Sequence, residues 1–477
     1  MSEPCDLSAI EARRAIGARQ LSPVELLESC LARISATNGA VNAMVAMDAD
    51  AARRRAREIE AAVGRGEEVG LLAGLPVGVK DLHLTAGLRT TFGSLLYKDH
   101  VPPKDDALVA RIRGAGGVIL GKTNTPEFGA GSNTVNRVYG ATGNPFDPIK
   151  TCAGSSGGSA VAVALAQVPL ATGSDYGGSL RTPAAFCGVA GFRPSPGLVP
   201  VAERPVSLNP FGVAGPMART IADAHLLLRA QAAIDRGDPF SPSAVAPLPP
   251  ELTGADLGTL RVAVSADLGC APVDRSIAAV FNGRVGRFRH VFREVEERAP
   301  DFSGVHQVFE TLRGVNFVAA HRERLEQARD LLDRNVIDNT ERGLELSLAD
   351  VARAHVEQSK IYRRVNAFFQ EVDVLICPAA SVSPFPHSQL FVEEIDGEAM
   401  PTYMRWLAIT YAPTMALCCA AAIPCGRDHA GLPFGLQVIG PNGADARVLE
   451  VAHALELALA ADPVTARPVP DWAGLAA

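Results

Sequence analysis

The sequence predicts an α/β fold in which a mixed central β-sheet is covered by helices on both faces. From residue 75 onward, short runs rich in β-branched residues alternate with alanine-rich segments of helical character. This alternation is typical of a sheet with helices packed against it. The composition agrees, because 47% of the 477 residues are hydrophobic and 20% are charged, so the chain can bury a large core.

The first 65 residues are predicted to be helical. Ser22-Pro23-Val24-Glu25 forms a capping box with proline at the first helical position. The apolar residues that follow recur at helical spacing, as shown by Leu26, Leu27, Cys30, Leu31 and Ile34. A second helix is predicted over residues 51–62, with arginine and glutamate on its solvent side.

The middle of the chain supplies the predicted sheet. Strands are expected at 77–80, 118–120 and 169–173, helices at 107–113 and 159–166, and a loop at 144–150. Residues 237–257 are rich in proline and indicate a surface linker. Amphipathic helices follow, for example at 277–295 and 319–336, and 373–378 returns to a strand.

We expect one domain over 1–477, built from four parts. These are N-terminal helices (1–65), a central core (72–220), a helical region that walls the substrate cavity (275–370) and a return to the core sheet (371–460).

Charge and cysteine content exclude several classes of function. The net charge of −7 and the pI near 5.9 argue against a nucleic-acid or anionic-membrane surface. The longest apolar stretches, such as 412–424, are too short to span a bilayer. The start of the chain lacks the layout of a secretion signal, and nine irregularly spaced cysteines indicate reduced thiols, so we expect a cytoplasmic protein. Neither Cys-x-x-Cys nor His-Glu-x-x-His is present, so we expect no metal and no cofactor.

Three short segments indicate a serine nucleophile. They are Gly-Val-Lys-Asp at 78–81, Ala-Gly-Ser-Ser-Gly-Gly-Ser at 153–159 and Gly-Ser-Asp-Tyr-Gly-Gly-Ser-Leu-Arg at 173–181. A serine hydroxyl needs a base within hydrogen-bond reach, and no histidine lies near either serine cluster. Lys80 follows an apolar run, and burial would lower its pKa enough for it to act as that base.

Two other patterns compete with this interpretation. Residues 116–123 match a phosphate-binding loop, but the strand-like segment 118–120 lies inside the pattern, where flexible backbone is needed. Residues 154–158 match a nucleophile elbow centred on Ser156, which would need a histidine such as His429 or His453. An elbow follows a buried strand, whereas 144–150 is predicted to be a loop.

Taken together, the motifs make the chain resemble the amidase signature hydrolases, a Ser-Ser-Lys group that acts on carboxylic amides. The resemblance runs through residues 72–220 and returns late in the chain. Besides the three serine and lysine segments, it is carried by Gly121–Phe128, Tyr139–Pro145, Pro183–Gly188 and Gly431–Gln437.

The resemblance implies a role for each motif residue. Ser179 corresponds to the nucleophile, Ser155 to a bridging serine that follows a cis peptide bond, and Lys80 to the base. The bridging serine would pass protons between the lysine and the nucleophile, and later to the leaving amine. Water would then hydrolyse the acyl-enzyme. Backbone N–H groups would stabilise the oxyanion, at Tyr176, Gly177, Gly178 and Ser179.

Neighbouring residues are expected to support this site. Ser156 would hydrogen-bond Ser155 and start the next helix, and Asp175 and Arg181 would pair across the nucleophile loop. Asp81 should point away from Lys80. We expect His83 in the core or behind the site, and Cys152 and Cys187 as small buried hydrophobes.

Substrate contacts are less constrained by the motifs. Gly131, Ser132 and Tyr176 are candidates, as are three residues of a late segment, Tyr403, Arg405 and Trp406. The family usually has glycine at position 153 and a small or β-branched residue at 176, so Ala153 and Tyr176 depart from it. If Arg405 reaches the cavity, a carboxylate-bearing substrate is indicated; an apolar cavity would favour an aryl or alkyl amide.

The function implied is that of an amidohydrolase that needs neither ATP nor metal and acts on a small-molecule amide. One alternative is the glutaminase-type subunit of a tRNA-dependent amidotransferase, which usually carries Met-Asp-Glu-Phe where this chain has Thr125-Pro126-Glu127-Phe128. Another is a catalytically silent scaffold protein, against which the intact Lys80, Ser155 and Ser179 argue. The resemblance leaves a homodimer open.

Overall fold

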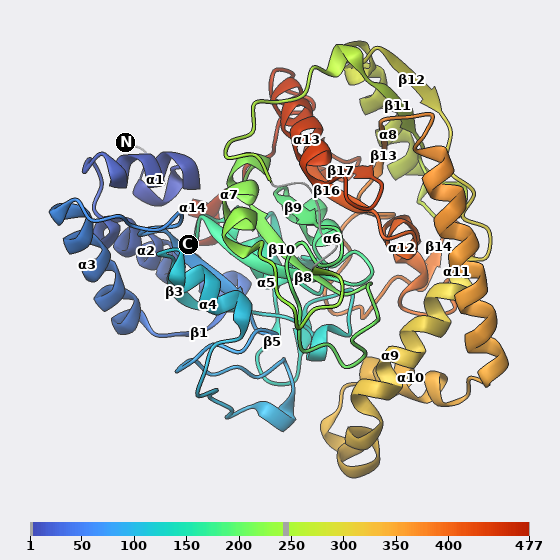
Figure 1. The fold of residues 1–477 in the computed structure, drawn as a ribbon, viewed down its shortest axis with the longest axis horizontal. Coiled ribbons are helices and arrows are strands. Elements are labelled where there is room, and N and C mark those ends of the chain that lie inside the picture. The colour runs from blue at the N-terminus through green and yellow to red at the C-terminus, as the bar shows by residue number, and fades with distance from the viewer. Residues whose placement is uncertain (1–2, 242–247, 477) are drawn as a thin grey trace.

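A computed structural model describes residues 3–241 and 248–476. An 11-stranded sheet crosses the molecule in the order β1-β3-β2-β8-β10-β9-β16-β17-β13-β11-β12 (Figure 1). In that order the strands are β1 (Met44–Met47), β3 (Val118–Thr123), β2 (Pro76–Lys80), β8 (Leu170–Asp175), β10 (Val213–Ala218), β9 (Ala190–Arg193), β16 (Cys419–Arg427), β17 (Pro433–Gly440), β13 (Val374–Pro378), β11 (Arg261–Val264) and β12 (Glu294–Glu297).

The sheet is mixed, as predicted. β2 lies parallel to both β3 and β8, and β11 lies parallel to both β12 and β13, whereas the remaining pairs are antiparallel. Three hairpins lie outside it: β4 (Val135–Asn136) with β5 (Gly140–Ala141), β6 (Gly143–Asn144) with β7 (Asp147–Thr151), and β14 (Glu394–Ile395) with β15 (Glu398–Ala399). Because β2 and β8 are parallel neighbours, their carboxyl ends meet at one edge of the sheet.

Helices cover both faces of the sheet, which confirms the predicted architecture. They are α1 (Ala9–Gly17), α2 (Pro23–Val41), α3 (Ala49–Arg65), α4 (Ala107–Gly114), α5 (Gly157–Ala164), α6 (Arg181–Cys187), α7 (Ile221–Gln231), α8 (Arg275–Phe288), α9 (Val305–Ala328), α10 (Arg334–Leu344), α11 (Leu348–Phe368), α12 (Ala408–Met415), α13 (Asp445–Ala460) and α14 (Trp472–Leu475). α5 and α6 contact each other and the central strands, and α7 and α13 form a second such pair.

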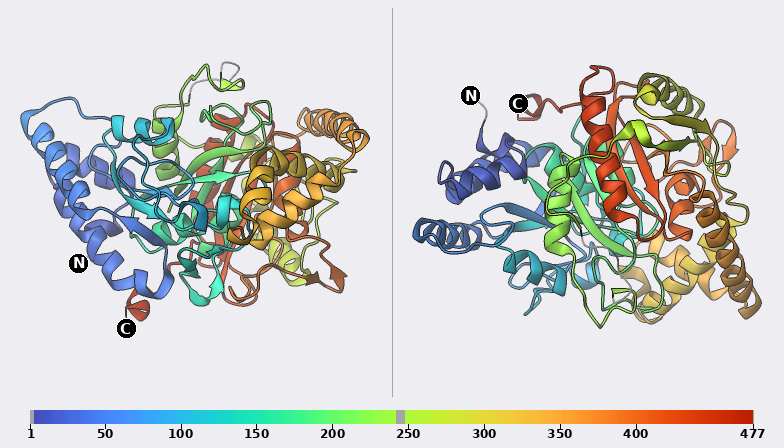
Figure 2. Two further views of the ribbon diagram at one scale, coloured as in Figure 1. Left: turned by 90° about the horizontal axis from the view of Figure 1, so that it is seen from below. Right: turned by 45° about the horizontal axis from the view of Figure 1, so that its top comes forward.

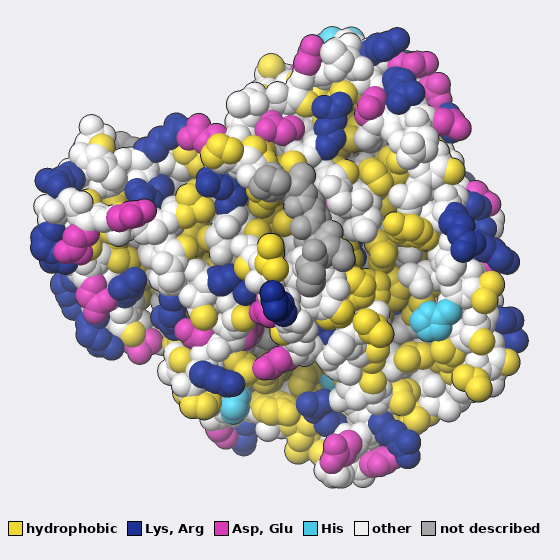
Figure 3. Space-filling model, in the orientation of Figure 1, with side chains coloured by type: hydrophobic (Ala, Val, Ile, Leu, Met, Phe, Trp, Pro, Cys, Tyr) yellow, Lys and Arg dark blue, Asp and Glu magenta, His cyan; other side chains and the backbone are white. Residues whose placement is uncertain are grey.

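Two groups of helices lie at the ends of the molecule. α2 and α3 pack together beside the β1 edge, whereas α9, α10 and α11 form a stack on the opposite side (Figure 2). On the face drawn in Figure 3, basic and acidic side chains lie interspersed. Ion pairs such as Arg53 with Glu28 and Arg55 with Glu58 account for part of this mixing over the N-terminal helices.

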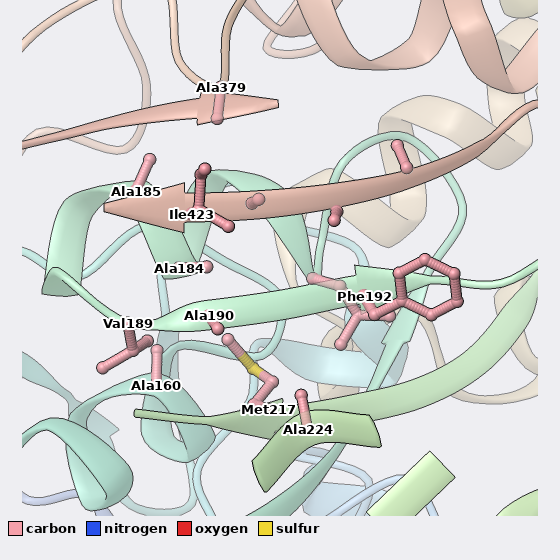
Figure 4. Close-up of a cluster of buried hydrophobic side chains, with 14 of the residues drawn as sticks. Ala160, Ala184, Ala185, Val189, Ala190, Phe192, Met217, Ala224, Ala379 and Ile423 are labelled. Atoms are coloured by element: carbon pink, nitrogen blue, oxygen red, sulfur yellow. The ribbon is translucent and has the colours of Figure 1, made fainter. Parts of the chain in front are cut away.

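Small side chains allow the layers to approach closely. Ala160 of α5 and Ala184 and Ala185 of α6 lie against the sheet, where Phe192 and Met217 fill the space between the strands and helices (Figure 4). All five are buried, the most exposed at 2%. Packing at this density holds the strand ends that carry the site in fixed positions.

Most predicted elements are present, and the capping box at Ser22 is confirmed. The strands predicted at 77–80, 118–120, 169–173 and 373–378 are β2, β3, β8 and β13, and the helices at 107–113 and 159–166 are α4 and α5. The single-domain division stays a prediction. No helix in the described part of the chain combines the length and apolar character needed to cross a bilayer.

Four expectations need correction or limitation. The helix predicted over 277–295 ends at Phe288, because the alternating residues that follow pair with β11 as strand β12. The helix predicted over 319–336 is broken between Ala328 and Arg334 by a 3-10 turn. The loop predicted at 144–150 contains the β6–β7 hairpin. Part of the predicted 237–257 linker, residues 242–247, lies outside the described residues.

Candidate active site

The site lies where the carboxyl ends of β2 and β8 meet the start of α5. Lys80 is the last residue of β2, and Ser174 and Asp175 end β8. Ser155 and Ser156 directly precede α5, and residues 176–180 form the loop between β8 and α6. The peptide bond between Gly154 and Ser155 is cis, as the resemblance implies.

Lys80 is fully buried among hydroxyl groups. Its Nζ lies 2.8 Å from Ser155 Oγ, 2.8 Å from Ser156 Oγ and 2.9 Å from Ser174 Oγ. Burial lowers the pKa of Lys80 to about 7, although the attraction of Asp175 opposes this shift. A substantial fraction of the lysine is therefore neutral at physiological pH, the state in which it can accept a proton.

The hydrogen-bond directions around the neutral amine limit its proton donor to two serines. A neutral amine donates two hydrogens and accepts one. Ser156 Oγ donates to the Ser174 carbonyl at 3.2 Å, so it can only accept from Lys80. The lone pair on Nζ is then left for Ser155 or Ser174, both of which line the same cavity as Ser179. The predicted hydrogen bond from Ser156 to Ser155 is absent among the described residues; Ser156 bonds Lys80 and Ser174 instead.

Asp175 holds the loop of residues 176–180 in shape. Its carboxylate accepts hydrogen bonds from the backbone N–H groups of Gly178 and Leu180 at 3.0 and 3.1 Å. It also accepts from Arg181 at 3.0 and 3.1 Å and from Arg193 at 3.1 Å, all fully buried. Although burial raises it, the pKa of Asp175 is held below its ordinary value by the two guanidinium groups. The predicted pairing of Asp175 with Arg181 is confirmed.

This arrangement corrects one of the predicted oxyanion donors. Because the N–H of Gly178 already donates to Asp175, it is not free to bind an oxyanion. Within 3–241 and 248–476, the N–H groups of Tyr176, Gly177 and Ser179 donate to no protein acceptor. Gly178 has φ of +125°, and a Cβ there would lie 2.2 Å from Thr410 Oγ1, so only glycine fits.

Ser179 is half-buried and lies in the wall of a cavity of about 980 Å³. Its hydroxyl makes no hydrogen bond with any described residue, so the direct contact from Ser179 to Ser155 is not formed in this arrangement. The wall combines aromatic, apolar and charged side chains; it includes His83, Phe92, Tyr97, Phe128, Gly131, Ser155, Ser174, Tyr176, Ser179, Arg313, Phe317, His321, Arg324, Met404 and Leu407.

The predicted substrate contacts are only partly found in this wall. Gly131 and Tyr176 line the cavity, whereas Ser132, Tyr403, Arg405 and Trp406 do not. In the late segment it is the flanking residues Met404 and Leu407 that face the cavity.

The four other candidates contact other protein side chains. The indole N–H of the buried Trp406 donates to Ser132 Oγ at 3.2 Å, and the Tyr403 hydroxyl accepts a hydrogen bond from Arg313. Arg405 pairs with Glu310 at 2.9 Å. The prediction that these four residues contact substrate is corrected, because none of them lines the cavity.

Several residues of the wall were missed from the sequence. Ser174 follows Thr172 at the spacing of two that places both on one side of β8, and Thr172 Oγ1 accepts from the Lys80 N–H at 2.9 Å. Strand alternation could therefore have indicated Ser174. Arg313, Phe317 and Arg324 share one face of α9, but only the tertiary fold brings that face to the cavity.

The neighbouring residues behave largely as expected. Asp81 accepts hydrogen bonds from the Thr91 N–H and hydroxyl and is absent from the cavity wall. His83 is the exception, because it lines the cavity instead of lying in the core or behind the site; its Nδ1 lies 3.0 Å from Asp106. Cys152 and Cys187 are buried. Ala153 has φ of +59°, a conformation that favours glycine, which accounts for the family's usual residue there.

The geometry also decides against the two alternative motifs. Lys122 of the phosphate-loop pattern is buried in β3, where Nζ donates to the His83 carbonyl and to Thr85. Neither His429, which is exposed, nor His453 on α13 lines the cavity that contains Ser155 and Ser179. Ser156 therefore lacks the histidine that an elbow nucleophile needs.

Comparison with known proteins agrees with the geometry. The profile of the Amidase family matches residues 25–449, most of the chain. The chain belongs to the amidase family. An acylamidase from Rhodococcus erythropolis is 33% identical to this amidase over 452 residues, which cover 94% of this chain and 95% of the relative. A glutamyl-tRNA(Gln) amidotransferase subunit from Anaeromyxobacter sp. (strain K) is 32% identical over 506 residues, which cover 98% and 99%.

Solved structures show the same fold. A bacterial aryl acylamidase of the amidase signature family superposes with a TM-score of 0.87 at 27% identity and covers 96% of each chain. The complex of 6-aminohexanoate cyclic dimer hydrolase with its substrate gives a TM-score of 0.85 at 25% identity, covering 98% of this amidase and all of that chain.

Replacing Asp175 with asparagine should destabilise the amidase by about 3–5 kcal/mol, because two buried guanidinium groups would lose their anion. Chemical denaturation measures this change in the free energy of unfolding. The matched control is Asp338→Asn, which removes an exposed partner of Arg342 and should cost no more than about 1 kcal/mol. Equal effects of the two substitutions would contradict the role assigned to Asp175.

Proposed function

We propose that this amidase cleaves a carboxylic amide to an acid and ammonia or an amine through an acyl-enzyme on Ser179. Lys80 acts as the base and Ser155 carries protons between Lys80 and Ser179. The observation that carries the proposal is the burial of Lys80, without a salt bridge to any described residue, against three serine hydroxyls. That setting produces a neutral amine where the family motif requires a base.

The first half-reaction forms the acyl-enzyme. Neutral Lys80 takes the hydroxyl proton of Ser155, while Ser155 Oγ takes that of Ser179, whose oxygen then attacks the amide carbonyl carbon. The negative charge that develops on the carbonyl oxygen faces the N–H groups of Tyr176, Gly177 and Ser179. When the C–N bond breaks, the proton from Ser155 moves to the leaving nitrogen and Lys80 returns its proton to Ser155.

The second half-reaction reverses these roles. A water molecule takes the place of the amine and gives a proton through Ser155 to Lys80 as its oxygen attacks the acyl carbon. Collapse of this second tetrahedral intermediate releases the acid and restores the hydroxyl of Ser179. Protons and bonds balance without any added group, so the proposal assigns the amidase neither metal nor cofactor.

We further propose a free-standing cytoplasmic enzyme. Similarity to an acylamidase and an aryl acylamidase supports independent action, as does the segment Thr125–Gly129. Similarity to the glutamyl-tRNA(Gln) amidotransferase component keeps a role within such a complex as the second candidate. All nine cysteines are unpaired, which suits a reducing compartment.

A fluorophosphonate should add once to the protein, on Ser179, because that hydroxyl is the nucleophile that faces the cavity. Intact-protein mass spectrometry with peptide mapping measures the adduct. We expect no adduct with Ser179→Ala, much slower labelling with Lys80→Ala, and normal labelling with Ser207→Ala, a matched change at an exposed serine. An adduct on Ser156 would contradict the proposal, and a folded protein that takes up no label would favour a silent scaffold.

The purified chain should release ammonia or amine from simple amides without ATP or tRNA. Amine release from a panel of alkyl and aryl amides measures this, with Ser179→Ala as the blank. Release that requires ATP and the other components of an amidotransferase would instead support the second candidate.

The value of kcat/KM should rise with pH through about 7 and level off above it. The pKa of Lys80 is lowered by burial to about 7, and only the neutral amine, which predominates above that pH, accepts the serine proton. Steady-state rates from about pH 5.5 to about pH 9 measure the profile. A profile that is flat across this range, or that falls through pH 7, would exclude Lys80 as the base.

A further inference from the structure

Arg313 of α9 is a buried cation in the wall of the same cavity. The residue is 7% exposed, and it lines the cavity together with Ser179. The guanidinium is fixed on one side, because Nε donates to Asn339 Oδ1 at 2.9 Å and Nη2 donates to the Tyr403 hydroxyl. Nη1 donates to none of the described residues, and it keeps some solvent-exposed surface. The free end of the fork therefore faces the cavity.

No carboxylate of the described residues pairs with this cation. The nearest acid along α9, Glu310, is taken by Arg405 at 2.9 Å. The immediate surroundings of Arg313 are aromatic, with the rings of Phe317, Tyr176 and Tyr403 at 4.5, 5.6 and 5.6 Å from the guanidinium carbon. Aromatic rings offset part of the desolvation cost of a cation, but they do not supply a counter-charge.

The acidic residues of the wall have partners elsewhere or are exposed. Asp105 pairs with Arg113, Asp175 pairs with its two arginines, and Asp106 Oδ2 lies 3.0 Å from His83 Nδ1. Glu203 is exposed at the rim. The wall around Arg313 thus keeps a positive charge.

A second arginine adds to this potential, and a neighbouring histidine stays neutral. Arg324 lies on the same face of α9 and, in the described part of the chain, also lacks an acidic partner; it lies against the rings of Tyr97 and Phe128. Burial, together with Arg324 and Arg313, lowers the pKa of His321 to about 4, so the histidine stays neutral near pH 7. The α9 side of the cavity is therefore suited to an anion.

We propose that Arg313 binds a carboxylate of the substrate, so that the preferred substrates are amides that also carry a carboxylate. This inference rests on the proposed amide hydrolysis. The free Nη1 hydrogens and the second Nη2 hydrogen match the two oxygens of a carboxylate. The aromatic part of the wall would contact the apolar part of the same molecule. Arg313 takes the role that the sequence suggested for Arg405.

The carboxylate can belong to the acyl part or to the amine part of the substrate, and two matched pairs separate these cases. Succinamate and 4-methylpentanamide differ in the charge on the acyl part. N-benzoylglycine and N-isobutylbenzamide differ in the charge on the amine part. For at least one pair, we expect kcat/KM of the anionic member to exceed that of its neutral isostere by about 100-fold.

The variant Arg313→Met should abolish this preference. We expect KM for the anionic substrate to rise so that kcat/KM falls about 100-fold, while the neutral isostere changes by less than about threefold. Arg322→Met is the matched control, because Arg322 lies on the exposed side of the same helix and pairs with Glu326. Equal rates on both members of each pair in the wild type, or an unchanged preference in Arg313→Met, would overturn the proposal.

If Arg313→Met does not fold, a second measurement on the wild type still tests the proposal. In the wild type, succinamate or N-benzoylglycine should slow fluorophosphonate labelling of Ser179 more than 4-methylpentanamide or N-isobutylbenzamide does. Labelling slowed equally by both would overturn carboxylate binding. Absence of both an adduct and any amide hydrolysis would instead refute the proposed function, whereas labelling with a preference for neutral amides would refute only the inference about Arg313.

Discussion

The buried carboxylate of Asp175 is the group on which the rest of the site depends. It accepts hydrogen bonds from two backbone N–H groups of the loop 176–180 and from Arg181. The guanidinium of Arg181 also donates to the Thr410 carbonyl and to Gln437. Arg193 extends the same cluster to β9. One carboxylate thereby joins β8, α6, β9, α12 and β17, so the position of Ser179 follows from the packing of five separate elements.

The same cluster explains how a lysine near a carboxylate can be neutral. A lone Asp175 would hold the proton on Lys80 by attraction. Two guanidinium groups compensate much of its charge, and the loss of hydration of Lys80 outweighs the attraction that remains. The serine hydroxyls around Nζ satisfy the amine without adding charge. Structural and catalytic electrostatics are thus linked through one residue.

Much of this site could be predicted from the sequence, because its candidate catalytic residues stand in short local motifs. Lys80, Ser155 and Ser179 stand in short segments whose residues are constrained by close backbone approach, and strand periodicity placed β2, β3 and β8 correctly. The failures are of another kind. The N–H of Gly178 is used by a side chain, and the late segment turns Met404 rather than Arg405 to the cavity. The first is a local contact between residues three apart that the motif alone does not reveal, whereas the second depends on packing between distant elements.

The helix boundaries failed for a related reason. The helix was predicted to continue to residue 295, but residues 294–297 pair with β11, so a tertiary contact overrides local propensity. Arg313 shows the limit most clearly, since a buried arginine on an amphipathic helix gives no sign in the sequence of lacking an acidic partner. Only the surrounding charges in three dimensions distinguish it from an ordinary ion pair.

The surroundings of the Lys80 amine come from β2, β8 and the start of α5. They therefore form only when these separate segments have come together during folding. Lys80 lies 75 residues from Ser155 and 94 from Ser174 in sequence, so these contacts close long loops. Until they form, the lysine remains hydrated and protonated. Under the proposed mechanism, a nascent or partly folded chain therefore lacks the base, which only completion of the sheet supplies.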